Sequence, residues 1–146
     1  MWSDQEIGFW KEYLQAHHGL DGELERLDGE FDLNIAVRVD GRLDAVLKVM
    51  RVGCGYDLVG MQVEALDHLA ATMPDLPVPR VIRRHDGAAA AAVTDLSGDE
   101  RIAWVISAID GLPLGAMRPH PAALVHEIGY TLGRMTAGLE GFDHAA

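Results

Sequence analysis

A single lysine in an apolar segment is the residue that points most directly to chemistry. Lys48 lies in the segment AVLKVM at residues 45–50, and the chain has only one other lysine, Lys11. A segment that is apolar on both faces predicts a strand buried on both sides. An ammonium on such a strand must reach water along its stem or contact an anion, because an unpaired buried charge is strongly unfavourable. Lys48 is therefore a candidate ligand for an anionic group.

Glu64 is the candidate partner of this lysine. It lies in a second apolar segment, residues 58–73, whose pattern is that of a helix. Nucleotide kinases hold a strand lysine against the phosphates of ATP with a helix glutamate. The pair predicts a nucleotide site in which Glu64 clamps Lys48. The alternative is that Lys48 extends into solvent from a strand end and that Glu64 is an ordinary solvated residue, and the pair alone does not decide between them.

Composition limits the partners of the chain. Its 146 residues suit one domain with a single core. The 23 acidic against 12 basic residues give a net charge of -11. This balance disfavours binding to nucleic acid or to an anionic membrane surface, because both need clustered Lys and Arg. A site for ATP remains compatible with it, since an anionic ligand needs only a local positive pocket.

Cysteine and histidine usage give further limits. Cys54 is the only cysteine, so no internal disulfide forms, and we expect a cytoplasmic protein. The start of the chain lacks the basic and apolar regions of a signal peptide, and no apolar run is long enough to span a bilayer. His17 and His18 are adjacent, but no further ligand stands at metal-site spacing, and Tyr130 occupies the position where His126 would need a second histidine. No metal site made of residues of this chain is expected.

The elements around Lys48 follow from periodicity and turn signals. A capping box, Ser3 with Glu6, begins a first helix, and Asp40–Gly41 is a hairpin signal before the Lys48 strand. Strands are expected at residues 23–27, 34–39, 45–50, 78–84, 88–93 and 102–109, with helices at 58–73 and after Pro121. The sequence predicts an α+β fold, a twisted antiparallel sheet of about five strands with a central helix and flanking terminal helices.

Several of these segments, taken in order, resemble a known family. They are residues 19–34 with the run GEFDLN, VLKV at 46–49, QVEAL at 62–66, PVP at 77–79, and 104–114 ending in DGLPL. The set resembles the protein-kinase-like N-lobe of the aminoglycoside phosphotransferase / choline kinase family. It is most similar to the homoserine- and hydroxylysine-kinase-like phosphotransferase domains, some of which are fused to class III aminotransferases.

The resemblance implies a role for each candidate site residue. Lys48 would contact the α- and β-phosphates of ATP, and Glu64 would hold its ammonium. The remaining cofactor-binding residues would be Gly29, Glu30, Asp32 and Asn34 in a loop over the phosphates, Val46 against adenine, and Ser107 and Ile109 in the hinge. Residues 1–111 would form the ATP-binding N-lobe, and residues 112–146 the hinge exit and first helix of a truncated C-lobe.

The family places its catalytic aspartate and its Mg²⁺ ligands in the C-lobe, after the hinge. The HDG run at 85–87 and the DLSG run at 95–98 precede the hinge and are interpreted as turns. We therefore expect no catalytic residue in this chain, which would be inactive alone. The complete kinase would use ATP and Mg²⁺ to phosphorylate a hydroxyl of an amino-bearing metabolite.

A different class of function stays open. The chain would then be a non-catalytic docking or dimerisation domain of a larger protein, such as a class III aminotransferase. In either case the apolar stripe of the final helix, from Leu124 to Leu139, would be partly uncovered, and self-association through it is expected.

Overall fold

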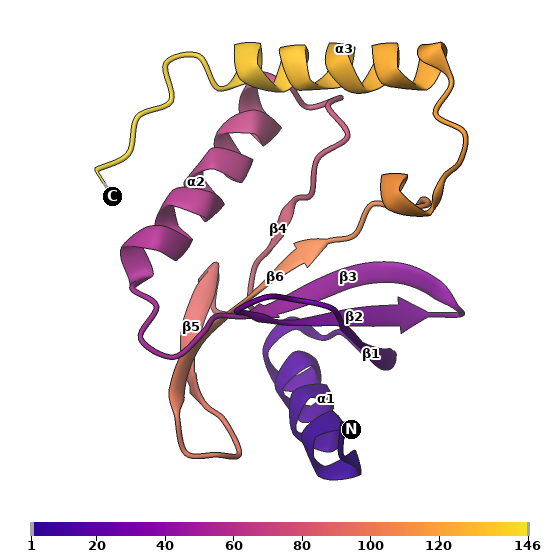
Figure 1. The fold of residues 1–146 in the computed structure, drawn as a ribbon. Helices are drawn as coiled ribbons and strands as arrows, with labels where there is room; N and C mark the ends of the chain where they lie inside the picture. The colour runs from indigo at the N-terminus through magenta and orange to yellow at the C-terminus, as the bar shows by residue number, and fades with distance from the viewer. Residues whose placement is uncertain (1, 146) are drawn as a thin grey trace.

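The computed structural model describes residues 2–145, which form three long helices around one antiparallel sheet (Figure 1). The helices are α1 (Asp4–His18), α2 (Tyr56–Thr72) and α3 (Ala122–Gly138), with a short 3-10 helix η1 (Leu114–Ala116). The strands are β1 (Glu23–Leu27), β2 (Leu33–Val39), β3 (Arg42–Val49), β4 (Val81–Ile82), β5 (Ala90–Thr94) and β6 (Glu100–Ser107). The predicted α+β class is confirmed.

The sheet has the order β1-β2-β3-β6-β4, and β5 also pairs with β6. The two short strands share the outer edge of β6, because β4 pairs with its end and β5 with the part before it. The expected sheet of about five strands therefore has six. The strand expected at residues 78–84 is reduced to two residues, Val81 and Ile82.

Helix α1 covers one face of the sheet. Its capping box is formed as predicted, with Ser3 and Glu6 bonded reciprocally. Trp10 and Leu14 are buried against alternate residues of the central strands, including Leu47 and Val105. Because side chains alternate between the two faces of a strand, this packing assigns Leu47, and the residues two positions before and after it, to the α1 face.

Helix α2 covers part of the opposite face. Val59 and Val63 of α2 pack with Trp104 of β6 and with Met50, just past the end of β3. Trp104 is the cross-strand partner of Lys48, so Lys48 lies on this same face. The central lysine therefore shares a face with an apolar cluster and stands where helical cover is incomplete.

Helix α3 lies away from the sheet and meets the rest of the structure near the end of α2 (Figure 1). Gly138, its only buried residue, approaches the side chains of Leu69 and Met73 so closely that a Cβ would lie 2.9 and 2.8 Å from them. Thr72 donates a hydrogen bond to the Gly138 carbonyl, and Arg134 forms an ion pair with Asp75. Most of α3 is thus exposed on the described structure.

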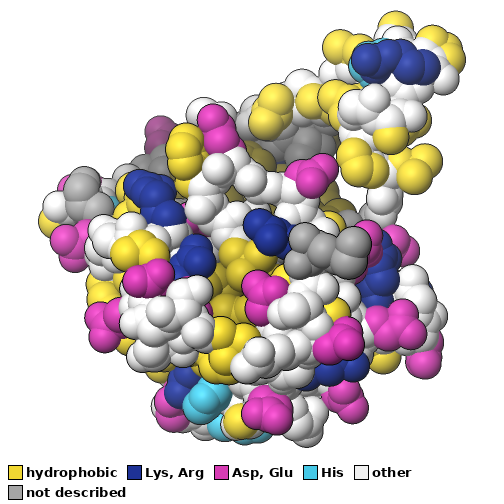
Figure 2. Space-filling model, turned by 60° about the horizontal axis from the view of Figure 1, so that its bottom comes forward, with side chains coloured by type: hydrophobic (Ala, Val, Ile, Leu, Met, Phe, Trp, Pro, Cys, Tyr) yellow, Lys and Arg dark blue, Asp and Glu magenta, His cyan; other side chains and the backbone are white. Residues whose placement is uncertain are grey.

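The surface carries charges of both signs. On the face drawn in Figure 2, most Lys and Arg side chains lie near Asp and Glu side chains, and no broad basic patch is visible there. None of the helices within residues 2–145 combines the length and apolar character needed to cross a membrane.

Candidate functional site

Lys48 is half-buried on β3, on the face that α2 covers in part. Its ammonium donates a hydrogen bond of 3.1 Å to the side-chain oxygen of Asn34, its cross-strand partner on β2. Within residues 2–145 no carboxylate forms an ion pair with it. The positive charge is held in place by a neutral amide, so it remains available to an anion.

Glu64 does not pair with Lys48 in this structure, and this expected contact needs correction. The exposed Glu64 carboxylate lies 3.6 Å from the imidazole of His144 instead. The reason is the orientation of α2, which packs on the sheet through Val59 and Val63. A helix turns by about 100° per residue, so the residue after Val63 points away from the sheet that carries Lys48.

Of the four residues expected near phosphate, Gly29, Glu30 and Asp32 lie in the loop between β1 and β2, whereas Asn34 lies at the start of β2. No backbone N–H group of residues 28–32 donates a hydrogen bond within the described chain. One side chain fastens the loop, because Asp32 accepts a hydrogen bond of 2.9 Å from the backbone N–H of Arg51. The loop therefore has unpaired backbone N–H groups and is held in place at Asp32, as is typical of an anion-binding loop.

Gly29 is required by close packing within this loop. A Cβ at this position would lie 2.5 Å from the Asp32 carbonyl oxygen and 2.8 Å from the amide nitrogen of Asn34. The same Asn34 side chain orients the Lys48 ammonium. The glycine and the lysine are thus coupled through one asparagine. The partnership of Asn34 with Lys48 was not expected from the sequence, although Asn34 was a candidate loop residue.

The hinge residues lie where β6 ends. The N–H of Ser107 donates to the Arg80 carbonyl and its hydroxyl accepts from the Arg80 N–H, both at 2.8 Å. Ala108 donates to the Asp44 carbonyl. The N–H of Ile109 has no acceptor within the described residues. Ser107 therefore acts as a structural anchor, and Ile109 keeps a free donor. Val46 pairs with Ile106 and lies on the Lys48 face.

Both acidic runs that precede the hinge are turns, as expected. Asp86 accepts a hydrogen bond of 3.0 Å from the Ala88 N–H, and Gly87 has a φ of 85°. Asp95 accepts from the N–H groups of Ser97 and Asp99. Their carboxylates close the turns. Within residues 2–145 no three His, Cys, Asp or Glu side chains are grouped as a metal site requires.

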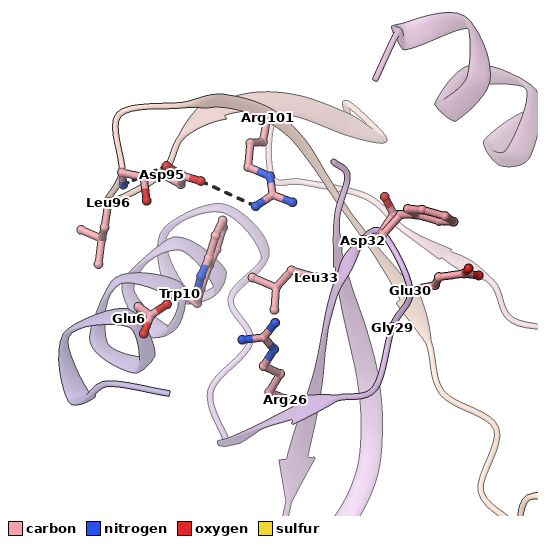
Figure 3. Close-up of a pocket in the computed structure, with 12 residues that line it drawn as sticks. Glu6, Trp10, Arg26, Gly29, Glu30, Asp32, Leu33, Asp95, Leu96 and Arg101 are labelled. Atoms are coloured by element: carbon pink, nitrogen blue, oxygen red, sulfur yellow. Dashed lines mark hydrogen bonds and ion pairs between the residues drawn. The ribbon is translucent and has the colours of Figure 1, made fainter. Parts of the chain in front are cut away.

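A polar cavity of about 290 Å³ lies on the other side of the phosphate-loop candidate (Figure 3). It is bordered by α1, by the β1–β2 loop and by the turn between β5 and β6. Leu33, one of its lining residues, packs with the α1-face core. The cavity and Lys48 thus belong to opposite faces of the sheet.

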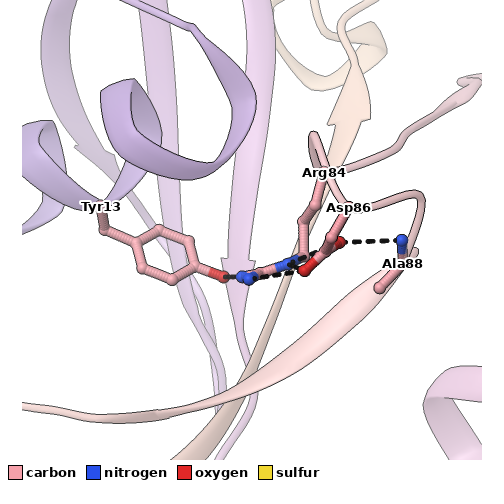
Figure 4. Close-up of polar contacts among 4 residues, drawn as sticks. All are labelled: Tyr13, Arg84, Asp86 and Ala88. Carbon is pink, nitrogen blue, oxygen red and sulfur yellow. Dashed lines mark hydrogen bonds and ion pairs between the residues drawn. The ribbon is translucent and has the colours of Figure 1, made fainter.

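Arg84, next to the β4–β5 turn, forms hydrogen bonds with residues of two elements (Figure 4). Arg84 donates to both carboxylate oxygens of Asp86 and, at 3.3 Å, to the hydroxyl of Tyr13 on α1. These bonds tie α1 to the turn. The hydrogen bonds from Arg84 and from the backbone of Ala88 lower the pKa of Asp86.

His18, at the end of α1, is the buried titratable residue of this region. It is 8% exposed. Burial lowers its pKa to about 4, and the positive charge of Arg84 and the neighbouring His17 act in the same direction. His18 is therefore neutral in the folded protein near neutral pH.

Comparisons with known proteins support the fold. No family model and no curated protein matches the sequence. Among solved structures, amicoumacin kinase hAmiN, solved in complex with AMP-PNP, Ca²⁺ and Ami, matches with a TM-score of 0.71 at 14% sequence identity. The match covers 99% of this chain and 42% of that kinase, so the chain spans less than half the length of its structural neighbour.

At this identity the match establishes the fold. The chain has a kinase-like N-lobe fold, with a six-stranded antiparallel sheet and three helices. The resemblance to homoserine- and hydroxylysine-kinase-like domains and the fusion to an aminotransferase stay predictions. The division of the chain into residues 1–111 and 112–146 also stays a prediction. Residues 1 and 146, at the ends of these ranges, lie outside the described residues.

Replacing Gly29 with alanine is expected to destabilise the loop. The added Cβ overlaps a backbone oxygen that cannot move freely, so the free energy of unfolding should fall by about 1–3 kcal/mol. Urea unfolding of Gly29→Ala measures this loss. Gly8→Ala is the matched control, because Gly8 lies inside α1 with open space around it, and there alanine should raise stability by up to about 1 kcal/mol. Equal effects at both positions would contradict the packing role of Gly29.

His18 is expected to make stability depend on pH between about 6.5 and 4. The folded pKa of about 4 lies below the ordinary value of 6.5, so the unfolded chain binds a proton first as the pH falls. The contribution is complete above pH 6.5 and is lost on acidification towards pH 4, by at most about 3 kcal/mol. His18→Gln should flatten the measured pH dependence in this window. His126→Gln, at an exposed position, should leave it unchanged.

Proposed function

We propose that this chain is the nucleotide-binding lobe of a small-molecule kinase. The observation that carries the proposal is the half-buried ammonium of Lys48, which is oriented by Asn34 at 3.1 Å and unopposed by any carboxylate of the described chain. A lysine in this setting neutralises phosphate charge, and phosphoryl transfer depends mainly on such electrostatic positioning.

The β1–β2 loop would cover the phosphates. Its unpaired N–H groups at residues 28–32 supply neutral donors, and the hydrogen bond between Asp32 and Arg51 holds the loop at its base. Gly29 permits the close approach of the loop to Asn34. Glu30 and Asp32 would serve through their backbone groups, because a carboxylate aimed at a phosphate would repel it.

The adenine would lie between the sheet and the chain that leaves it. Val46 provides an apolar contact on the Lys48 face, and Ile109 provides a free backbone N–H. Ser107 would shape the hinge without touching the base, because its own N–H and hydroxyl are bonded to Arg80. Glu64 would reach Lys48 only after a rotation of α2 that releases it from His144.

The remaining chemistry would come from outside the described residues. ATP would require a divalent cation such as Mg²⁺ for charge neutralisation, and the described chain offers no group of three ligands for it. We propose that a C-lobe supplies the metal ligands, the aspartate that orients the acceptor hydroxyl, and the contacts to an amino-bearing substrate. The structural neighbour, a kinase solved with AMP-PNP, Ca²⁺ and Ami, supports this assignment.

A second candidate function is docking of another polypeptide through α3. Val125 and Leu132 are 57% and 54% exposed, and they lie seven residues apart on one side of the helix. Leu112, in the segment before α3, is 76% exposed. An apolar surface of this kind usually marks an interaction site, so a non-catalytic docking or dimerisation domain is the competing proposal.

Replacing Lys48 with methionine is expected to weaken nucleotide binding. Methionine keeps the apolar stem but removes the charge, and loss of a charge-assisted contact should weaken affinity for Mg·AMP-PNP by about tenfold to a hundredfold. The rise in melting temperature that the nucleotide causes measures this loss. Lys11→Met is the matched control, because it removes the only other lysine and leaves the sheet intact. A rise in melting temperature that is as large in Lys48→Met as in the parent chain would refute the proposed site. If the nucleotide causes no rise in the parent chain itself, the docking domain would be favoured.

The exposed side of α3 is expected to cause self-association at high concentration. Burying Val125 and Leu132 in a second copy removes apolar area from water, so light scattering should show a mass that grows with concentration. The double variant Val125→Glu/Leu132→Glu should stay monomeric. His126→Glu, a change of charge on the same helix, should associate as the parent does. A parent chain that is monomeric throughout would rule out this interface.

A further inference from the structure

The cavity on the α1 face shares the β1–β2 loop with the proposed nucleotide site but lies on the opposite side of the sheet from Lys48. Its volume of about 290 Å³ is at the lower end of the range for small-molecule sites. Its walls come from three segments distant in sequence, and Trp10 and Leu33 give it apolar surface (Figure 3). A cavity of this volume suits a ligand of metabolite size.

One pair of charges in the cavity is already satisfied. Arg101 donates to the carbonyl oxygens of Met50 and Val49 and lies 3.6 Å from a carboxylate oxygen of Asp95. The side chains of this pair are only 17% and 13% exposed. The other oxygen of Asp95 is bound by two backbone N–H groups of its turn. This pair therefore forms a rigid wall with little net charge.

A second pair of opposite charges faces the same cavity without joining. Arg26 makes no hydrogen bond or ion pair within residues 2–145, and its guanidinium extends into the cavity towards Arg101 (Figure 3). Glu6 lies on the α1 side, where only one of its two carboxylate oxygens is engaged, by the N–H and hydroxyl of Ser3. Glu6 and Arg26 are near enough to attract each other, yet no direct contact forms.

We infer that this cavity binds a small zwitterion, a free α-amino acid, between Arg26 and Glu6. The guanidinium of Arg26 would take the ligand carboxylate in a bidentate contact. The free oxygen of Glu6 would take the ligand ammonium. The ligand side chain would lie against Trp10 and Leu33.

The balance of charge selects this class of ligand over simpler ions. A plain anion would meet Arg26 but would also face Glu6, whereas a plain cation would meet Glu6 but would also face Arg26. A zwitterion satisfies both free groups at once. Glu30 and Asp32 also line the cavity, but Figure 3 shows the Glu30 carboxylate directed away from the two arginines, and Asp32 accepts a hydrogen bond from the backbone N–H of Arg51.

The test is calorimetric titration of the chain, without nucleotide, with each of the twenty proteinogenic amino acids. At least one is expected to bind, and its methyl ester and its N-acetyl derivative should each bind at least about tenfold more weakly. Arg26→Gln and Glu6→Gln should each cause a similar loss. Glu6→Gln keeps an oxygen that accepts from Ser3, so the helix cap and the melting temperature should be maintained.

Arg42→Gln and Glu12→Gln are the controls, because both residues are exposed and neither lines this cavity. The inference is overturned if no amino acid binds up to about 10 mM, if the ester binds as well as the acid, or if inorganic phosphate binds in its place. The variant Lys48→Met separates this test from the nucleotide proposal. Because Lys48 lies on the opposite face of the sheet, this variant should bind the amino acid as the parent chain does.

Discussion

The register between β2 and β3 is the constraint on which the candidate site depends. The strands pair Arg38 with Leu43 near their hairpin but Val37 with Ala45 one step further on, so Asp44 is an extra residue in β3. Without this bulge, Leu33 and not Asn34 would stand opposite Lys48. The bulge thus places an amide oxygen, and not a leucine, beside the ammonium. The candidate site is therefore created by an irregularity in the backbone.

The two helices that cover the sheet make its faces unequal. Helix α1 buries one face with Trp10 and Leu14, whereas α2 covers only part of the other. Lys48 lies on the second face, which also carries the cluster of Trp104 and Met50, and the residue is half-buried there. A lysine in this position is confined without being sealed from solvent, which is the condition under which an anion is attracted and still able to enter.

The elements could be predicted from sequence more completely than the contacts between them. Strand β1 and the helix begun by Ser3 follow local rules of periodicity and capping, and the structure has both. The pairing of Lys48 with Asn34 depends on the bulge at Asp44, which no turn or periodic signal reveals. Strand β4 is short because β5 takes over the same edge of β6 from Trp104 onwards, a tertiary arrangement that strand propensity does not contain.

The position of Glu64 shows why a matching pair of residue types does not guarantee a pair in space. Glu64 follows Val63 directly, and the rotation of α2 that buries Val63 turns the next residue away from the sheet. Its carboxylate then lies at His144, in the segment that follows α3. Moving Glu64 to Lys48 would require α2 to rotate and would expose part of the Val59 and Val63 packing. The free energy for such a rotation must come from a ligand that binds the rotated state better, and under the proposed function this ligand would be the phosphate at Lys48.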